Sequence, residues 1–130
     1  MSEISGSGAL TQLLYALNES GGFALSILTD RQGFSIASAA SPEQNPDVKA
    51  ATVAVVNKML AQAREHLEMA PTDEITLHGV DGQRLVCRPF QVEDLEFILA
   101  VLVPSKQQSY RQLTNQLIRD VRRIWKSHWE

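Results

Sequence analysis

The run Leu95–Val103 constrains the fold more than any other segment of the chain. Eight of its nine residues are apolar, and they do not alternate with polar residues. A strand with this pattern is usually buried on both faces, so we place it in the middle of a sheet. Both faces of that sheet then need helices to cover them. The run therefore predicts a three-layer α+β sandwich.

Hydrophobic spacing and turn residues predict the elements before this strand. Leucines at positions 10, 13, 14 and 17 have the spacing of a helix with one buried face, which Gly21-Gly22 ends. Two β-hairpins follow, one over residues 23–39 and one over residues 74–90, the second turning at Asp81-Gly82. Between the hairpins, a capping asparagine and a proline predict a long helix over residues 46–69.

The last predicted helix opens at Ser105, where Ser105 and Gln108 fit a capping box. The predicted order is thus α-β-β-α-β-β-β-α, with a mostly antiparallel sheet of five strands. A chain of 130 residues fits one core. We expect a disordered tail over residues 1–8 and a single domain over residues 9–130.

Composition and charge exclude several classes of protein. The net charge of −3 argues against a general nucleic-acid binder, and the single cysteine against a disulfide-stapled secreted fold. The N-terminal sequence lacks the charged and apolar regions of a signal peptide, and no apolar run approaches the ~20 residues of a membrane span. We therefore expect a soluble cytoplasmic protein.

The side chains that often carry chemistry are few and poorly spaced. His66, His78, His128 and Cys87 show no metal-ligand spacing, and Cys87 is expected to be a small core residue. The chain lacks Gly-x-Ser-x-Gly, and its glycine-rich start lacks the lysine of a phosphate-binding loop. We expect no catalytic residue, no cofactor and no metal.

The middle helix carries more apolar surface than one subunit can cover. At ~100° per residue its apolar positions spread over roughly 200°, whereas a surface helix needs ~100° or slightly more. The strand that begins at Glu74 would also leave one edge bare in a monomer. Both features predict a homodimer, unless the helix sinks deeper into its own core. The interface residues that we expect are Val48, Val55, Val56, Met59, Gln62, His66, Ile75 and Leu77.

The last helix is basic, although the chain as a whole is acidic. Residues 105–130 hold six basic and two acidic residues. Cations near a helix C-terminus are favoured by the helix dipole, by about 0.3–1 kcal/mol each, which is one explanation. The other is a surface for an acidic partner or an anionic lipid. Its candidate residues are Arg119, Arg122, Arg123, Lys126 and Trp129.

Both hairpins resemble those of the roadblock/dynein light-chain family. The similarity is carried by the strand, Asp-x-x-Gly, strand segment over residues 23–37, the alanine-rich helix, and the segment over residues 75–90 with Gly-x-Asp-Gly and Arg-Pro. It covers roughly residues 8–125. The resemblance implies a non-enzymatic dimer, joined edge to edge with its middle helices side by side, that regulates or scaffolds a small Ras-like GTPase.

Two other functions remain open from the sequence. Profilin-like and PAS-like sensory domains share these layers, and would need a ligand cavity between sheet and helix. A structural adaptor subunit of a larger complex would need only the dimer surface.

Overall fold

The computed structural model describes residues 6–42, 45–68 and 73–129. Its helices are α1 (Gly6–Gly21), α2 (Pro46–Leu67) and α3 (Arg111–Trp129). Its strands are β1 (Leu25–Asp30), β2 (Ser35–Ala40), β3 (Ile75–His78), β4 (Arg84–Val92) and β5 (Leu95–Val103). The predicted order of elements is confirmed, and the strand bounds differ from expectation by two residues at most.

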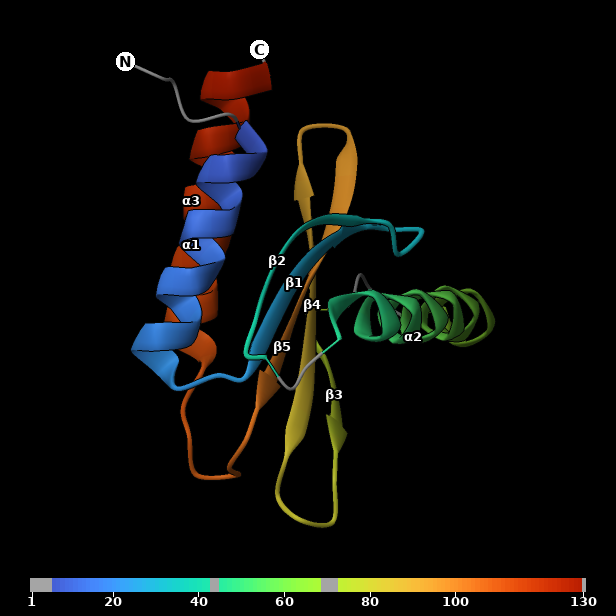
Figure 1. Cartoon of the computed structure of the whole chain (residues 1–130). Helices are drawn as coiled ribbons and strands as arrows, with labels where there is room; N and C mark the ends of the chain where they lie inside the picture. The colour runs from blue at the N-terminus through green and yellow to red at the C-terminus, as the bar shows by residue number, and fades with distance from the viewer. Residues whose placement is uncertain (1–5, 43–44, 69–72, 130) are drawn as a thin grey trace.

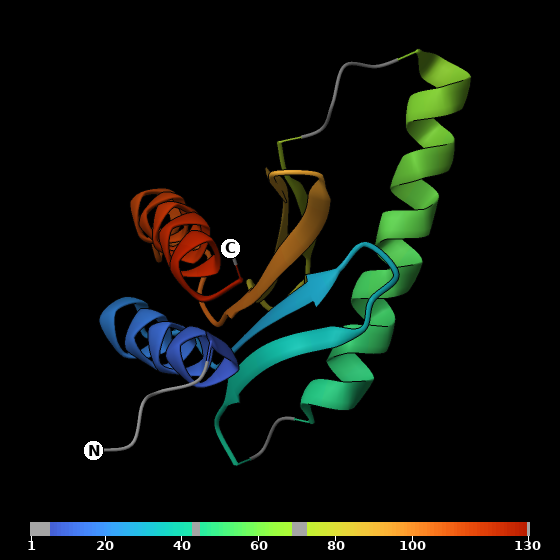
Figure 2. The same ribbon diagram turned by 90° about the horizontal axis from the view of Figure 1, so that it is seen from above.

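The five strands form one antiparallel sheet in the order β2-β1-β5-β4-β3. β5 is the central strand, and its residues 97–103 are all buried. Helices α1 and α3 lie side by side on one face of the sheet, and α2 lies alone across the other (Figure 1). This is the predicted three-layer sandwich. Figure 2 shows from above that the C-terminal part of α2 reaches past the strands.

Buried hydrophobic residues pack on both faces of the sheet, between it and the helices. The larger core lies under α1 and α3, and is built from alternate residues of the central strands together with the leucine stripe of α1. Trp125 of α3 closes one side of this core, with its ring edge-on to Phe97 at 4.9 Å between centroids. The smaller core lies under α2 and contains Val53, Cys87, Ile98 and Ala100. Cys87 is therefore a core residue, as predicted.

The turns that connect the strands owe their shape to aspartate and glycine. In the β1–β2 turn, the Asp30 carboxylate accepts hydrogen bonds from the backbone N–H groups of Gln32 and Phe34, at 2.9 and 3.0 Å. In the β3–β4 turn, Gly82 has a φ of 93°, a left-handed conformation that costs glycine little. Both predicted hairpins are confirmed.

Helix α1 begins earlier than predicted. Residues 6–8, which we expected to be disordered, form its first turn, and Gly6 and Gly8 are half-buried. The turn is thus packed against the rest of the molecule, which stabilises helical backbone that the Ser/Gly-rich sequence disfavours by itself. Residues 1–5 lie outside the described residues.

Helix α3 begins six residues later than predicted. The Gln108 side chain does accept from the Ser105 N–H at 2.9 Å, as in a capping box. However, the Arg84 guanidinium donates to the backbone carbonyls of Ser105 and Gln108 at 2.8 and 2.6 Å. These carbonyls are thereby turned toward the sheet, so residues 105–108 form a separate turn, and the helix starts at Arg111.

Candidate interaction surfaces

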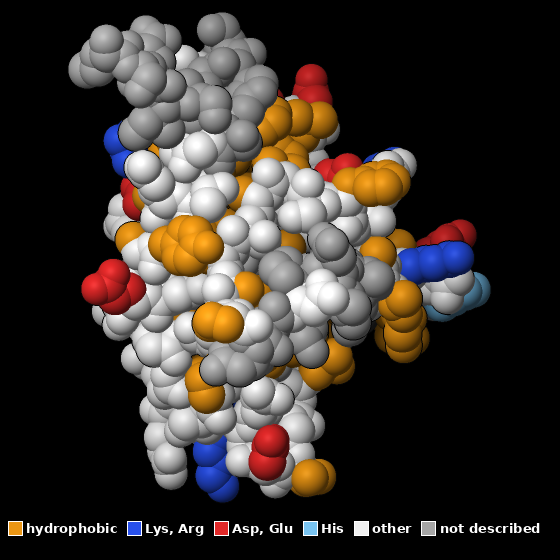
Figure 3. Space-filling model, in the orientation of Figure 1, with side chains coloured by type: hydrophobic (Ala, Val, Ile, Leu, Met, Phe, Trp, Pro, Cys, Tyr) orange, Lys and Arg blue, Asp and Glu red, His pale blue; other side chains and the backbone are white. Residues whose placement is uncertain are grey.

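Helix α2 presents an exposed stripe directly opposite its buried face. Val55 and Met59 are 59% and 64% exposed, and Gln62 and His66 continue the same line at helical spacing. Orange side chains of this helix protrude on the right of Figure 3. Two large exposed apolar side chains on one helix face make this face a candidate interaction surface. We call Val55, Met59, Gln62 and His66 the α2 stripe.

The other predicted interface residues divide into three groups. Leu77 of β3 is 46% exposed. Val56 and Ile75 are half-buried and pack against the small core under α2, within this subunit. Val48 lies on α2 in line with the stripe, but its side chain lies outside the described residues. The structure therefore brings the α2 stripe and Leu77 to the surface, while Val56 and Ile75 support them from below.

Strand β3 forms one edge of the sheet, as predicted. It pairs only with β4, through Ile75–Cys87 to His78–Arg84, and its other side has no partner strand among the described residues. Such an edge offers backbone N–H and C=O groups to another strand. β4 extends beyond β3, and there Pro89 contributes no backbone N–H. This part of β4 is a poorer template for strand pairing than β3.

Among the described residues, the hollow found between α2 and the sheet is small. A hollow of about 10 Å³ lies there, lined by apolar residues that include Val53, Leu60 and Ile98. The Cys87 thiol borders it, and burial raises the pKa of this thiol to about 11. A volume of this size holds at most a single water molecule. This hollow cannot contain a drug-sized ligand, which needs about 300 Å³ or more.

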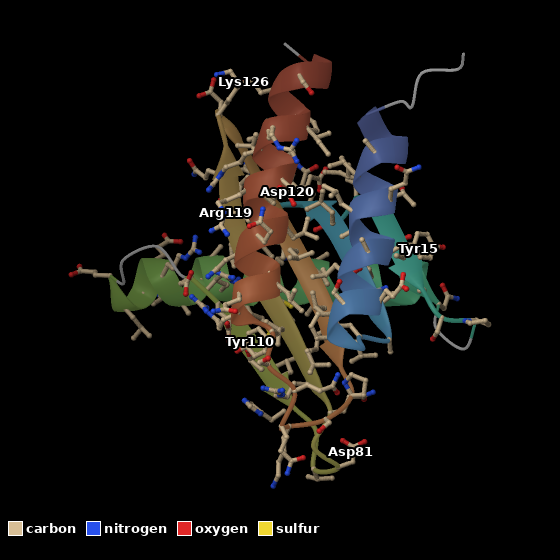
Figure 4. The ribbon with its side chains drawn as sticks, turned by 90° about the vertical axis from the view of Figure 1, so that its left-hand side faces the viewer. Tyr15, Asp81, Tyr110, Arg119, Asp120 and Lys126 are labelled. Atoms are coloured by element: carbon tan, nitrogen blue, oxygen red, sulfur yellow. The ribbon has the colours of Figure 1, made fainter. Side chains whose placement is uncertain are left out.

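The basic residues of α3 lie on its exposed side, but they have different surroundings. Arg119 and Lys126 point toward the β4–β5 hairpin, whereas Asp120 lies on the side of α1 (Figure 4). Arg122 donates to the Gln91 carbonyl at 2.9 Å and lies over the Phe90 ring. Arg123 forms an ion pair with Asp120 at 3.2 Å. The side chain of the fifth candidate, Trp129, lies outside the described residues.

A buried arginine links the sheet to α3 and to the segment before β3. Arg88 of β4 is 5% exposed and donates to Thr114 Oγ1 at 2.8 Å and to Asn115 Oδ1. It also pairs with Asp73 at 3.2 Å, and Asp73 in turn pairs with Arg111 at 2.8 Å. These contacts join residues that are far apart in the sequence, and they place Asp73 beside the start of α3.

Glu74 is the second carboxylate of this network. It accepts hydrogen bonds from the Thr76 and Tyr110 hydroxyls, both at 2.6 Å, and pairs with Arg111 at 2.9 Å. Burial raises the pKa of Glu74, but the hydrogen bonds from Thr76, Tyr110 and Arg111 outweigh burial and hold it below its usual value. The hydrogen bond from Arg111 is the main cause that lowers the pKa of Asp73. Both carboxylates are therefore ionised at neutral pH.

Asp73, Glu74 and Arg88 are not among the candidate residues that the sequence predicts. One signal was available. Val86, Arg88, Phe90 and Val92 alternate along β4, so the arginine occupies a position that faces the core. A buried charge requires partners. The pattern could therefore have predicted an ion-pair network, although not the residues that complete it.

No cluster of three or more potential metal ligands is present in the part of the chain that the structure describes. Among the helices of the same residues, none is long and apolar enough to cross a membrane.

The layers, the strand order and the lone helix on one face are those of a roadblock domain. Myxococcus xanthus MglB has a similar fold, with a TM-score of 0.76 at 14% identity, over 100% of this chain and 96% of that one. An MglB with a tetrameric arrangement gives 0.74 at 14% identity, over 98% and 96%. A Roadblock/LC7 domain from Streptomyces avermitilis gives 0.67 at 13% identity, over 90% and 95%.

No protein-family model and no curated protein matches the sequence itself. The predicted resemblance to roadblock proteins is thus confirmed at the level of the fold.

Proposed function

We propose that this chain is a cytoplasmic, non-enzymatic homodimer that regulates or tethers a small Ras-like GTPase. The dimer proposal is supported by two features of the subunit, which are the exposed α2 stripe and the β3 edge without a partner strand among the described residues. Edge-to-edge pairing of two β3 strands would satisfy their outer backbone groups, and two α2 stripes would cover each other across the same two-fold axis. The roadblock fold supports the GTPase as partner, since that is what the family resemblance implies.

The sensory alternative has less support. A profilin-like or PAS-like ligand domain needs a cavity between α2 and the sheet. The hollow of about 10 Å³ at that position is far below the size of an ordinary ligand site. A structural adaptor subunit would share the dimer but would show no dependence on nucleotide, so the same experiments separate it from a GTPase regulator.

Sedimentation of matched variants tests the dimer. A Val55→Glu/Met59→Glu double variant places two carboxylates on each facing stripe, and we expect it to sediment as a monomer at concentrations where the parent is a dimer. Ala61→Glu is the control, because Ala61 is exposed on another side of α2. The dimer proposal fails if the parent is monomeric at micromolar concentration, or if Ala61→Glu dissociates it equally.

The GTPase proposal is tested with a Ras-like GTPase from the same genome. We expect the purified chain to bind this protein differently when it is loaded with GDP and with a non-hydrolysable GTP analogue, or to change its rate of GTP hydrolysis. A stable dimer that is indifferent to the nucleotide would support the adaptor function instead.

A further inference from the structure

A groove of about 450 Å³ runs between α3 and β4, on the face of the sheet opposite α2. Residues of both elements line it, together with Asp73 from the segment before β3. The charged and polar lining residues are Asp73, Arg88, Asn115, Arg119 and Arg122. The apolar ones are Pro89, Phe90 and Ile118. The groove thus combines three arginines with an apolar floor.

The lining of the groove carries a net positive charge, and its carboxylate does not cancel the charge of the exposed arginines. Its one carboxylate, Asp73, is already neutralised by ion pairs with Arg88 and Arg111. Arg119 and Arg122 are exposed, and neither forms an ion pair with a carboxylate of the described residues. Two guanidinium groups on one wall can therefore each bind an external carboxylate, in the two-pronged geometry that arginine favours.

Two of the three arginines, Arg88 and Arg122, are held in place by contacts within the subunit. Arg122 is held by its Nε–H bond to the Gln91 carbonyl and by its position 5.8 Å above the Phe90 ring, which leaves its terminal nitrogens for a ligand. Arg88, almost fully buried, is fixed by Thr114 and Asn115. Side chains ordered before binding lose less entropy when the partner arrives.

We propose that this groove binds an extended acidic segment of a partner protein. Its carboxylates would pair with Arg119 and Arg122, and an apolar side chain between them would rest on Phe90 and Ile118. The alternation of charged wall and apolar floor fits a peptide that carries both acidic and apolar residues. Lys126 points the same way as Arg119 and lengthens the basic surface beyond the groove (Figure 4).

Binding of a peptide of alternating glutamate and leucine tests this proposal. With a fluorescent label on the peptide, we expect saturable binding to the parent chain that weakens with salt. An Arg119→Glu/Arg122→Glu variant should bind about tenfold more weakly or worse. The control is Arg123→Glu/Lys106→Glu, which changes the net charge equally but touches no lining residue of the groove. It should keep most of the binding.

Several outcomes would overturn the proposal. Absence of peptide binding to the parent would do so, as would an equal loss in both double variants, which would indicate general charge attraction. Binding of phosphatidylserine vesicles but not of the peptide would assign the arginines to a membrane. If Arg119→Glu/Arg122→Glu instead changed the oligomeric state, the groove would belong to a second copy of this chain.

Arg122 also packs on Phe90, so its replacement could disturb the fold. Arg119→Glu alone therefore serves as a second variant, since Gln116 is the one hydrogen-bond partner of the Arg119 side chain among the described residues. We expect it to weaken the peptide several-fold with an unchanged melting temperature. The α2 stripe lies on the other face of the sheet, so a failed dimer test leaves this proposal standing, and the reverse also holds.

Discussion

Arg88 connects the sheet, α3 and the start of β3 through one guanidinium group. Its partners Asp73, Thr114 and Asn115 are 15 to 27 residues away in the sequence. Because Asp73 is shared with Arg111, and Glu74 binds Arg111 and Tyr110, the network fixes the beginning of the edge strand relative to α3. At this scale, electrostatics decides where an otherwise irregular segment lies.

The ion-pair network of Asp73 and Glu74 makes the free energy of unfolding depend on pH. The pKa values of Asp73 and Glu74 lie below their usual values in the folded state, so the folded chain binds protons less readily than the unfolded chain. The stability they contribute is present above the unfolded pKa values of about 4 and is lost as the pH falls through the folded ones. We expect urea midpoints to decrease steeply below about pH 4.

Glu74→Gln separates this contribution from general acid denaturation. The variant should be less stable than the parent at pH 7 and should lose less stability between pH 7 and pH 3. Glu65→Gln, an exposed carboxylate on α2, is the control. Parallel pH profiles for the parent and Glu74→Gln would contradict the role of the network.

At the level of elements, the Gln108 side chain, which lies in the turn before α3, contacts the C-terminal end of α1. Gln108 donates to the carbonyls of Gly21 and Gly22 at 2.8 and 3.0 Å, and so satisfies backbone groups at the C-terminus of α1. The same side chain accepts from Ser105 N–H. One amide group thereby ties the turn before α3 to the end of α1.

Gln108→Ala should lower the free energy of unfolding by about 1–2 kcal/mol, because two carbonyls lose their partner. Gln107→Ala is the matched control, since Gln107 is exposed and, within the described part of the chain, its hydrogen bonds are with Ser105. We expect it to change stability by less than about 0.5 kcal/mol in urea denaturation. Similar losses in the two variants would show that the Gln108 contacts contribute little.

The elements were predictable where local chemistry determines them. Leu95–Val103 shows no alternation because both its faces are covered, and the Asp-Gly turn forms its hairpin from local geometry alone. The start of α3 was mispredicted because Arg84, more than 20 residues away, takes the carbonyls that a helix would use. The partners of Arg88 and the α3–β4 groove escaped prediction for the same reason, since each depends on contacts between distant segments.

At the scale of the whole molecule, the sheet has two edges that differ in what lies beside them. β2 is one edge and β3 the other. If the proposed dimer pairs through β3, the backbone amides of residues 75–78 should exchange with solvent more slowly as the protein concentration rises. Those of residues 35–40 in β2 should not respond. Slower exchange in β2 instead would assign the interface to the opposite edge.

The pairing of β1 with β5 has a consequence for synthesis on the ribosome. Leu25 lies opposite Leu102 in the sheet, so the first strand has its inner neighbour only after most of the chain has been translated. Until then the β1–β2 hairpin carries apolar side chains on both faces without β5 beside it. Contacts between such distant segments slow folding and prolong the exposure of aggregation-prone apolar surface. We therefore expect the nascent chain to be most prone to aggregation just before its central strand emerges.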